Sequence, residues 1–324
     1  MTLWAIDHSI KSNGLAMSPT HLVPRSLRYL EAVLEHGSIQ GASRATGISA
    51  SAIDRQIRLL EDRLEVQLFD RLPSGAVLNP VGEMFVVLSR RWRADERRIA
   101  SDVKQMQGID TGHIRVAAMD SLVNGVIPRF LGRVAGDYPR VRIDVEIVTP
   151  DGAAAMLDDG QVDLALAFNL KPGRDLHMLW SAELPLFCIV ATDHPLSESA
   201  ALTLGEVRNQ AIVVQSKALT IRRMLEARHS WIFSEGPPPV VTNSLQLLKQ
   251  LVVAGRHVAL TSELDAAPEI ASGLVKAIPI RGSDVSGQTI GLAINPRRTL
   301  PKIAIAIADE LSREVERSLD EVRR

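Results

Sequence analysis

One predicted helix, which begins at Ser49 and runs through Glu61 and beyond, leaves four polar side chains on the side that does not face a core: Ser51, Asp54, Arg55 and Arg58. The other side carries four aliphatic residues at helical spacing, which we expect to be buried: Ile53, Ile57, Leu60 and Leu64. Guanidinium and hydroxyl groups donate hydrogen bonds to phosphates and base edges, and an aspartate accepts one from the amino group of cytosine. The chemistry available here is nucleic-acid binding; the alternative is a solvated, charged face on a small helical core.

A tight turn precedes this helix. We expect Ser38 to cap an earlier helix over 41–46, Gly47 to end that helix, and Ser49 to cap the next one. Small residues at 41–43 allow the two helices to cross closely, as a helix-turn-helix requires before its second helix can enter a DNA major groove. The turn favours DNA binding but leaves a plain three-helix core open.

A short apolar hairpin with a Pro-Ser-Gly turn follows within 66–85. After it, Asn79 and Pro80 are expected to be the cap and the first residue of a further helix. A hairpin in this place is typical of the wing in a winged helix-turn-helix.

Residues 25 to about 106 resemble the DNA-binding domain and linker helix of the LysR-type transcriptional regulators. The matching positions are Ser38, Ala42, Ser49, Ala52, Ile53, Gln56, Ile57, Leu60, Glu61, Leu68, Phe69, Arg71, Leu78 and Gly82. The expected DNA-binding residues are Ser38, Ser49, Ala50, Ser51, Asp54, Arg55, Arg58 and Arg71. The sequence departs from the family pattern at Thr46, Ala50, Ser51 and Asp54, which indicates an unusual target sequence.

The helix after the wing carries one apolar residue every seven positions: Phe85, Trp92, Ile99 and Met106. This is the spacing of one seam position in a coiled coil, although only Leu88 is apolar at the companion position. The spacing predicts that all five residues form a dimer contact, which would hold two recognition helices roughly 34 Å apart, one turn of DNA. The alternative is a single amphipathic helix lying on its own domain.

From Ile114 onward, short runs rich in valine and isoleucine alternate with helical stretches, which predicts β-α units and mostly parallel sheets. This part resembles the effector domain of the same family through Pro128, Phe130 and the segments 157–168 and 243–260. The resemblance implies two lobes with a fold similar to that of periplasmic solute-binding proteins.

The predicted fold class is therefore α/β: an N-terminal winged helix-turn-helix (24–82), a long linker helix (83–111) and a C-terminal two-lobed effector domain (112–324). Within that domain we expect lobe I at about 112–190 and 290–324, and lobe II at about 191–289. The chain is expected to cross between the lobes within 191–199 and around 280–288.

Six polar residues lie where predicted strands end or predicted helices begin: Ser121, Thr149, Gln215, Ser216, Asn243 and Ser244. Helix N-termini offer unpaired N–H groups and a partial positive charge, so we expect these residues to bind a small organic effector between the lobes. Arg222 and Arg223 could add a cation for an anionic effector. Each of the six could equally be a helix cap or a turn residue.

Composition and motifs limit the other possibilities. The 324 residues carry a formal charge of −1, and the one cysteine, Cys188, lies in an apolar run where a buried thiol is expected. The sequence lacks the phosphate-binding GxxxxGK[ST] motif, the zinc-binding HExxH motif and a cysteine pair. We therefore expect no catalytic residue, no metal and no cofactor.

Residues 1–23 lack a secretory apolar region, and no later run reaches the roughly 18 apolar residues of a membrane helix. We expect a cytoplasmic protein without a membrane partner. Residues 1–23 are expected to be a disordered N-terminal extension, and Met17 is an alternative start of the chain. The expected partners are double-stranded operator DNA, further copies of the chain as a dimer or tetramer, the effector, and RNA polymerase if the protein activates transcription. The alternative class is a solute-binding protein of the transport type, which the missing signal peptide disfavours.

Overall fold

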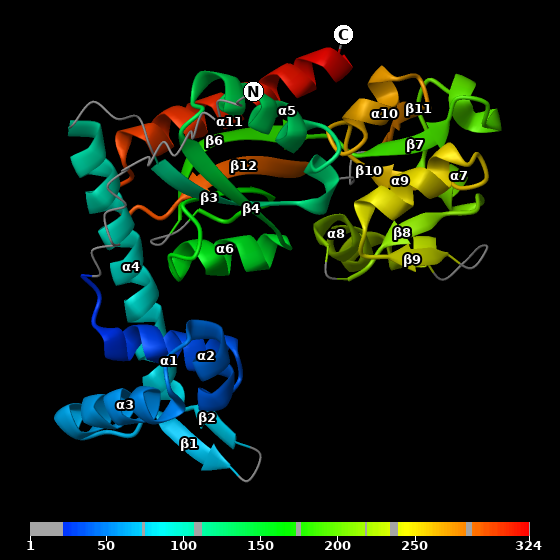
Figure 1. Ribbon diagram of the computed structural model, residues 1–324. Helices are drawn as coiled ribbons and strands as arrows, with labels where there is room; N and C mark the ends of the chain where they lie inside the picture. Colours follow the sequence, from blue (N-terminus) through cyan, green and yellow to red (C-terminus); the bar gives the residue numbers. More distant parts are fainter. Residues whose placement is uncertain are drawn as a thin grey trace, which may run out of the picture. The chain divides into compact units, whose positions relative to one another are not determined.

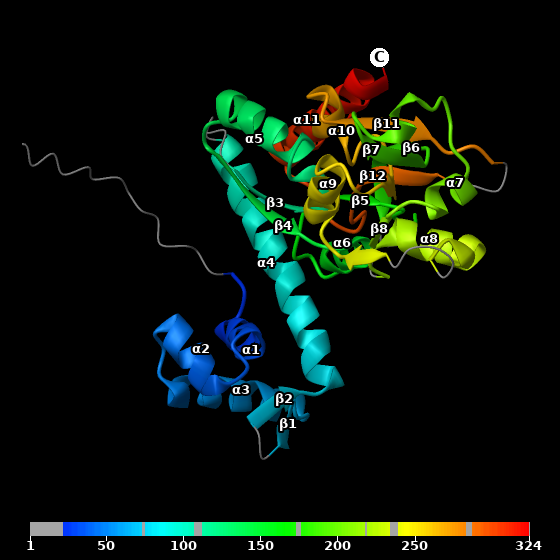
Figure 2. The same ribbon diagram turned by 90° about the vertical axis from the view of Figure 1, so that its right-hand side faces the viewer.

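The computed structural model describes residues 22–72, 75–106, 112–172, 176–217, 219–233, 239–282 and 287–323, without the side chains of 71, 72, 75, 76, 101, 102 and 104–106. The chain divides into two compact units, Met1–Ser89 and Arg90–Arg324 (Figures 1 and 2). The predicted disorder of 1–23 falls almost wholly outside the described residues. Within the described ranges, no helix combines the length and the apolar composition of a membrane span.

The described part of the first unit contains three whole helices, a hairpin and the start of a fourth helix. Its elements are α1 (Arg25–Glu35), α2 (Ile39–Thr46), α3 (Ala50–Leu64), β1 (Phe69–Leu72) and β2 (Gly75–Leu78), after which α4 (Pro80–Met106) begins. The two strands pair antiparallel, with Phe69 opposite Leu78. The predicted helix-turn-helix and wing are thus present in the order that the sequence indicates.

The predicted helix ends are confirmed. The hydroxyl of Ser38 accepts a hydrogen bond from the backbone N–H of Gly41 at 2.9 Å, and Gly47 ends α2 with φ of 70°. The hydroxyl of Ser49 accepts from the N–H of Ala52 at 3.3 Å. These caps satisfy N–H groups that a helix start leaves unpaired, so they fix the turn between α2 and α3.

Close packing then fixes α3 against the hairpin. Ile53 and Ile57 are buried, whereas Leu64, which we predicted to be buried, is 37% exposed. That prediction is wrong because the helix ends at Leu64 and Leu68 fills the core instead. A Cβ at Gly82 would collide with the carbonyl oxygen of Leu68, so only glycine permits α4 to approach the hairpin this closely.

Lobe I of the second unit is built on a five-stranded sheet in the order β4-β3-β5-β12-β6. The strands are β3 (Gly112–Ala118), β4 (Val141–Ile147), β5 (Leu164–Phe168), β6 (His177–Leu184) and β12 (Gln288–Ile294). Helices α5 (Val126–Asp137) and α11 (Lys302–Arg323) cover one face and α6 (Pro150–Asp158) covers the other (Figure 1). Their apolar sides form one large core with the sheet.

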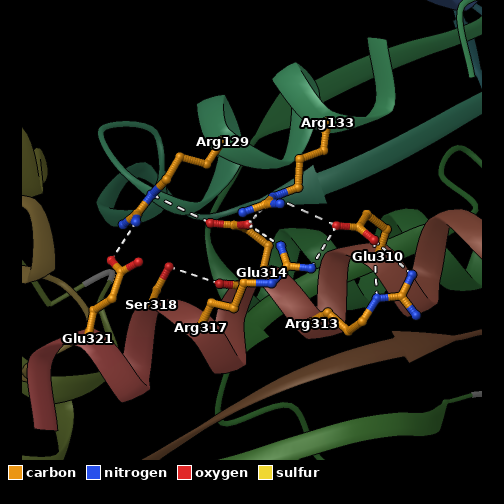
Figure 3. Close-up of polar contacts among 8 residues, drawn as sticks. All are labelled: Arg129, Arg133, Glu310, Arg313, Glu314, Arg317, Ser318 and Glu321. Atoms are coloured by element: carbon orange, nitrogen blue, oxygen red, sulfur yellow. Dashed lines mark hydrogen bonds and ion pairs between the residues drawn. The ribbon is translucent and has the colours of Figure 1, made fainter. Parts of the chain in front are cut away.

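Arginine and glutamate side chains join α5 to α11 over that core (Figure 3). Glu314 of α11 is buried and accepts hydrogen bonds from Arg133 at 2.9 Å and from Arg317 at 2.8 Å. Arg129 reaches Glu321 at 2.6 Å. Because the carboxylate of Glu314 is out of water, these partners are what make its burial tolerable.

Lobe II has an antiparallel sheet in the order β10-β7-β11 and a parallel pair, β8-β9. The strands are β7 (Phe187–Ala191), β8 (Val213–Gln215), β9 (Val240–Thr242), β10 (Ala259–Thr261) and β11 (Val275–Pro279). Its helices are α7 (Leu204–Arg208), α8 (Thr220–His229), α9 (Leu245–Val253) and α10 (Ala267–Ala271). Short 3-10 helices occur in lobe II at η2 (Pro195–Glu198) and η3 (Ser230–Phe233), and in lobe I at η1 (Asp120–Leu122).

Two topological expectations are wrong. The larger sheets are not mostly parallel: the sheet of lobe I is mixed, because β12 runs antiparallel to both β5 and β6, and the three-stranded sheet of lobe II is antiparallel throughout. The first crossing lies between β6 and β7, near Pro185, and not within 191–199. The expected boundary at 190 fails because 187–191 pairs in the sheet of lobe II, whereas β12 returns to lobe I from Gln288.

Candidate functional site

The polar face of α3 is open to solvent in the first unit. Ser51, Arg55 and Arg58 are exposed, while Ala50 and Asp54 are partly covered. The guanidinium Nε of Arg58 lies 2.7 Å from Oδ2 of Asp54, one helical turn earlier. This hydrogen bond raises the pKa of Arg58 and neutralises Asp54 locally, so the aspartate does not present an unopposed negative charge.

A groove of about 520 Å³ runs between α1 and α3. It is lined by Arg25, Tyr29, Ser51, Ala52, Arg55 and Gln56. Two arginines, two hydroxyls and an amide are donors suited to phosphate oxygens and base edges. The groove therefore extends the polar face of α3 onto α1, which sequence reasoning did not include.

The other predicted DNA-binding residues have different surroundings. The hydroxyls of Ser38 and Ser49 are engaged as helix caps, so they position the two helices. Arg71 is in β1, opposite Ala76, and its side chain is outside the described residues.

The predicted contact positions of α4 do not share one environment. Phe85 packs against the hairpin core of the first unit, and Leu88 is half-buried. In the second unit, Trp92 is 43% exposed and Ile99 is 44% exposed. The side chain of Met106 lies outside the described residues. Large apolar side chains so exposed on one helix are typical of a surface that a partner covers.

A cavity of about 280 Å³ lies between the two lobes of the second unit. Five of the six predicted effector residues line it: Ser121, Thr149, Gln215, Asn243 and Ser244. They come from the ends of β3, β4, β8 and β9, which meet because strand ends of neighbouring β-α units share one edge. Apolar side chains complete the wall, among them Met119, Ile147, Phe168, Leu219 and Leu245.

The sixth predicted residue and the two arginines lie elsewhere. Ser216 is not among the lining residues, and its N–H donates to the carbonyl of Thr242 at 2.8 Å, which holds β8 to β9. The guanidinium of Arg222 stacks 3.6 Å above the ring centroid of Phe233, and Arg223 pairs with Asp151 at 2.9 Å. Neither arginine is among the residues that line the cavity, and the contacts with Phe233 and Asp151 engage both side chains.

Asp120, which sequence reasoning missed, closes one end of the cavity. Its Oδ2 accepts hydrogen bonds from the N–H groups of Leu245 at 2.6 Å and Gln246 at 3.3 Å, and from the hydroxyl of Ser244 at 3.2 Å. A carboxylate from lobe I thus occupies the N-terminus of α9 in lobe II. Asp120 follows the same strand as Ser121, so the rule that selected Ser121, a polar residue at a strand end, could also have selected Asp120.

Asp265 and Gln288 were also missed, and both are buried in the cavity wall. Oδ2 of Asp265 accepts from the hydroxyls of Thr261 at 2.6 Å and Ser262 at 2.9 Å. Asp265 lies four residues after β10, which is again a strand end. No sequence signal marks Gln288, because it starts a strand that returns to lobe I from the opposite direction.

Four polar atoms in this wall are buried without a hydrogen-bond partner in the described structure: Oγ of Ser121, Oε1 of Gln215, Oγ1 of Thr220 and Oδ1 of Asp265. An unpaired buried polar atom is unfavourable by about 1–3 kcal/mol, so such atoms are rare. They tend to mark places where a ligand, an ion or a water molecule binds. The arrangement can hold a small molecule by hydrogen bonds at one side and apolar contacts at the other.

Two sequence-family models match the chain. Residues 24–83 match the model described as bacterial regulatory helix-turn-helix protein, lysR family, and residues 107–316 match the LysR substrate binding domain. The helix-turn-helix and the cavity described above lie within these two matches.

Individual relatives agree with the family models. A probable RuBisCO transcriptional regulator of Trichormus variabilis is 25% identical over 291 residues, which cover 88% of this chain and 86% of the relative. The RuBisCO operon transcriptional regulator of Allochromatium vinosum is 28% identical over 208 residues, covering 64% of this chain and 68% of the relative.

Solved structures show the same fold. A full-length OxyR variant from Pseudomonas aeruginosa superimposes with a TM-score of 0.64 at 18% identity, covering 89% of this chain and 96% of that one. Full-length CbnR complexed with its target DNA gives a TM-score of 0.60 at 18% identity, with coverage of 90% and 99%.

Proposed function

Because the chain belongs to the LysR family of transcriptional regulators, we propose that its α3 enters the major groove of operator DNA and that Arg55 contacts a base edge or a phosphate there. The observation that carries this proposal is the exposed polar face of α3 behind two capped helix starts. Arg25 and Ser51 extend the contact along the groove beside α1. Arg58 is held by Asp54, so it serves the contact more weakly than Arg55.

The protein is a regulator with a helix-turn-helix DNA-binding domain and an effector-binding domain. We further propose that it works as a dimer or tetramer through α4, where the exposed side chains of Trp92 and Ile99 fall seven residues apart. Covering them in a partner would remove apolar surface from water and hold two α3 helices at successive turns of DNA. Contact with RNA polymerase belongs to this proposal in the case of activation.

The cavity of the second unit is proposed as the effector site. Its support is the meeting of Ser121, Gln215 and Asp265, each with a buried unpaired polar atom, in the wall of one cavity. An effector bound between the lobes would shift them relative to each other, since both contribute residues to the wall. The proposed activity is binding, without a catalytic residue, metal or cofactor, in the cytoplasm where the chromosome is accessible.

The test is operator binding by the full chain, with an operator selected by the purified protein from random-sequence duplex DNA. Arg55→Ala should weaken binding by about 1–3 kcal/mol, because an arginine that reads a base edge contributes about that much. Arg63→Ala is the matched control, since Arg63 is an exposed arginine near the end of the same helix. Equal affinities of the Arg55 variant and the wild type in fluorescence anisotropy would refute the assignment.

A further inference from the structure

The charged side chains that line the interlobe cavity are both acidic. Asp120 and Asp265 are among the lining residues, which include no lysine, arginine or histidine within the described structure. A cavity with this wall repels an anion and attracts a cation, and it does so strongly because the walls exclude water. The charge of the wall therefore bears on the kind of effector that fits.

The protein itself offsets the negative charge of Asp120. Its carboxylate sits at the N-terminus of α9, where it accepts two backbone N–H groups and the hydroxyl of Ser244. A helix N-terminus carries about half a positive charge, so this position offsets much of the negative charge of Asp120. It also means that α9 has no free N-terminus to offer to an anionic effector.

No cationic group offsets the negative charge of Asp265 among the residues that the structure describes. Every other buried carboxylate of the second unit has a cation partner: Glu263 pairs with Arg323 at 2.7 Å, Glu269 with Lys249 at 3.0 Å, Glu310 with Arg313 at 2.7 Å and Glu314 with Arg317 at 2.8 Å. Asp265 is 2% exposed and has hydroxyl, amide and backbone N–H partners only, among the residues that the structure describes. An unneutralised buried carboxylate is unfavourable, and a bound cation would relieve that.

The neighbouring neutral groups suit the same ligand. Oε1 of Gln215 is unpaired and can only accept a hydrogen bond, and its orientation is fixed because Nε2 donates to the carbonyl of Leu260 at 3.3 Å. Oγ of Ser121 is also unpaired and can accept. Phe168 and the aliphatic wall residues leave room beside these acceptors for a short apolar chain. The cavity volume of about 280 Å³ has room for a small organic molecule.

We infer that the effector is a compact organic amine whose ammonium group is bound at Asp265, with Gln215 and Ser121 as further acceptors. The inference rests on the proposed role of this cavity as the effector site. Leu219 and Thr220, at the start of α8, also line the cavity and would contact the rest of such an amine.

Four probes of equal chain length test the charge directly on the full chain: 1,4-diaminobutane, 4-aminobutanoate, 1,4-butanediol and succinate. Binding is measured by calorimetry and by the rise in melting temperature, since a ligand that binds only the folded state stabilises it. At least one of the two amines should bind about ten- to a hundred-fold more tightly than the diol, because a hydrogen bond to a charged group is stronger than a neutral one. Succinate should bind no better than the diol.

Asp265→Asn should remove the preference for amines while the shape of the cavity is retained. Asp137→Asn, at the exposed end of α5 and away from the cavity, is the matched charge control and should keep the preference. The comparison of the four probes on the wild-type protein tests the inference even if the Asp265 variant fails to fold.

A ranking led by succinate, equal binding of diol and amines, or no binding of any amine at millimolar concentration would overturn the inference. Operator binding is measured on the same samples. If the operator is bound while the amine ranking fails, the error lies in the class of effector; if the operator is not bound, the regulatory proposal itself is wrong.

Discussion

The polar face of α3 and the interlobe cavity keep their charged groups in opposite environments. On α3 the Asp54–Arg58 pair has side chains 38% and 51% exposed, so water and salt screen it. In the cavity wall, Asp265 is buried and lacks a cation partner among the described residues. A DNA-binding surface therefore gains affinity by summing many screened contacts, whereas in the cavity a single charge can decide which small molecule binds.

The largest expected effect concerns a buried charge. Lys249→Met leaves the carboxylate of Glu269 in the interior with the amide of Asn124, at 2.9 Å, as its only partner among the residues that the structure describes. Breaking a buried pair on one side should lower the free energy of unfolding by about 3–5 kcal/mol. The measurement is chemical denaturation of the full chain.

Arg58→Ala is the exposed counterpart and should leave the melting temperature unchanged, because solvent screens that pair. Similar losses of stability in the Lys249 and Arg58 variants would break the comparison between buried and exposed charges.

The next largest effect is expected from a charge introduced among the exposed apolar side chains of α4. Trp92→Glu should convert the protein to monomers and weaken operator binding at least about tenfold, since the carboxylate would have to be buried against a partner copy. Sedimentation or light scattering reports the mass. Glu83→Gln, at an exposed position of the same helix, serves as a control for an altered charge alone. An unchanged mass for the Trp92 variant would place the dimer contact elsewhere.

A smaller effect on stability is expected when the pH is lowered, through the carboxylate of Glu310 in the charged cluster between α5 and α11. Burial tends to raise the pKa of Glu310, but hydrogen bonds from Arg313 and Arg317 outweigh it, so the pKa is lowered overall (Figure 3). A lowered pKa in the folded state means that the carboxylate contributes stability above its ordinary pKa of about 4.3 and loses it as the pH falls through the folded value.

Melting temperatures of the wild type and Glu310→Gln should therefore differ at pH 7 and converge below about pH 4. A difference between the two proteins that stays constant from pH 7 to pH 3 would mean that the Glu310 carboxylate contributes no pH-dependent stability.

The contrast between the two regions also explains what the sequence could predict. The polar face of α3, its caps and the wing lie within one continuous stretch, where helical spacing and capping residues determine the outcome. Leu64 was misassigned because spacing does not say where the chain leaves the core.

The cavity is assembled from separate segments that are spread along the chain from Met119 to Gln288. Ser121, Thr149, Gln215, Asn243 and Ser244 could be predicted because strand ends gather at one edge. Gln288 could not, since nothing local indicates that β12 returns antiparallel to lobe I. Arg222 and Arg223 were misplaced because the direction of a long side chain depends on partners such as Phe233 and Asp151.

The central claim is that α3 binds the operator and that the interlobe cavity separately binds the effector. Its most direct test is a joint titration of operator and amine probe with Ser121→Val and Arg55→Ala. Oγ of Ser121 has no partner in the described structure, so valine removes a ligand contact without breaking a bond of the fold. We predict that Ser121→Val keeps wild-type operator affinity but loses about tenfold in amine affinity, and that Arg55→Ala does the reverse. Loss of operator binding in the Ser121 variant, with the amine still bound at wild-type affinity, would contradict the account.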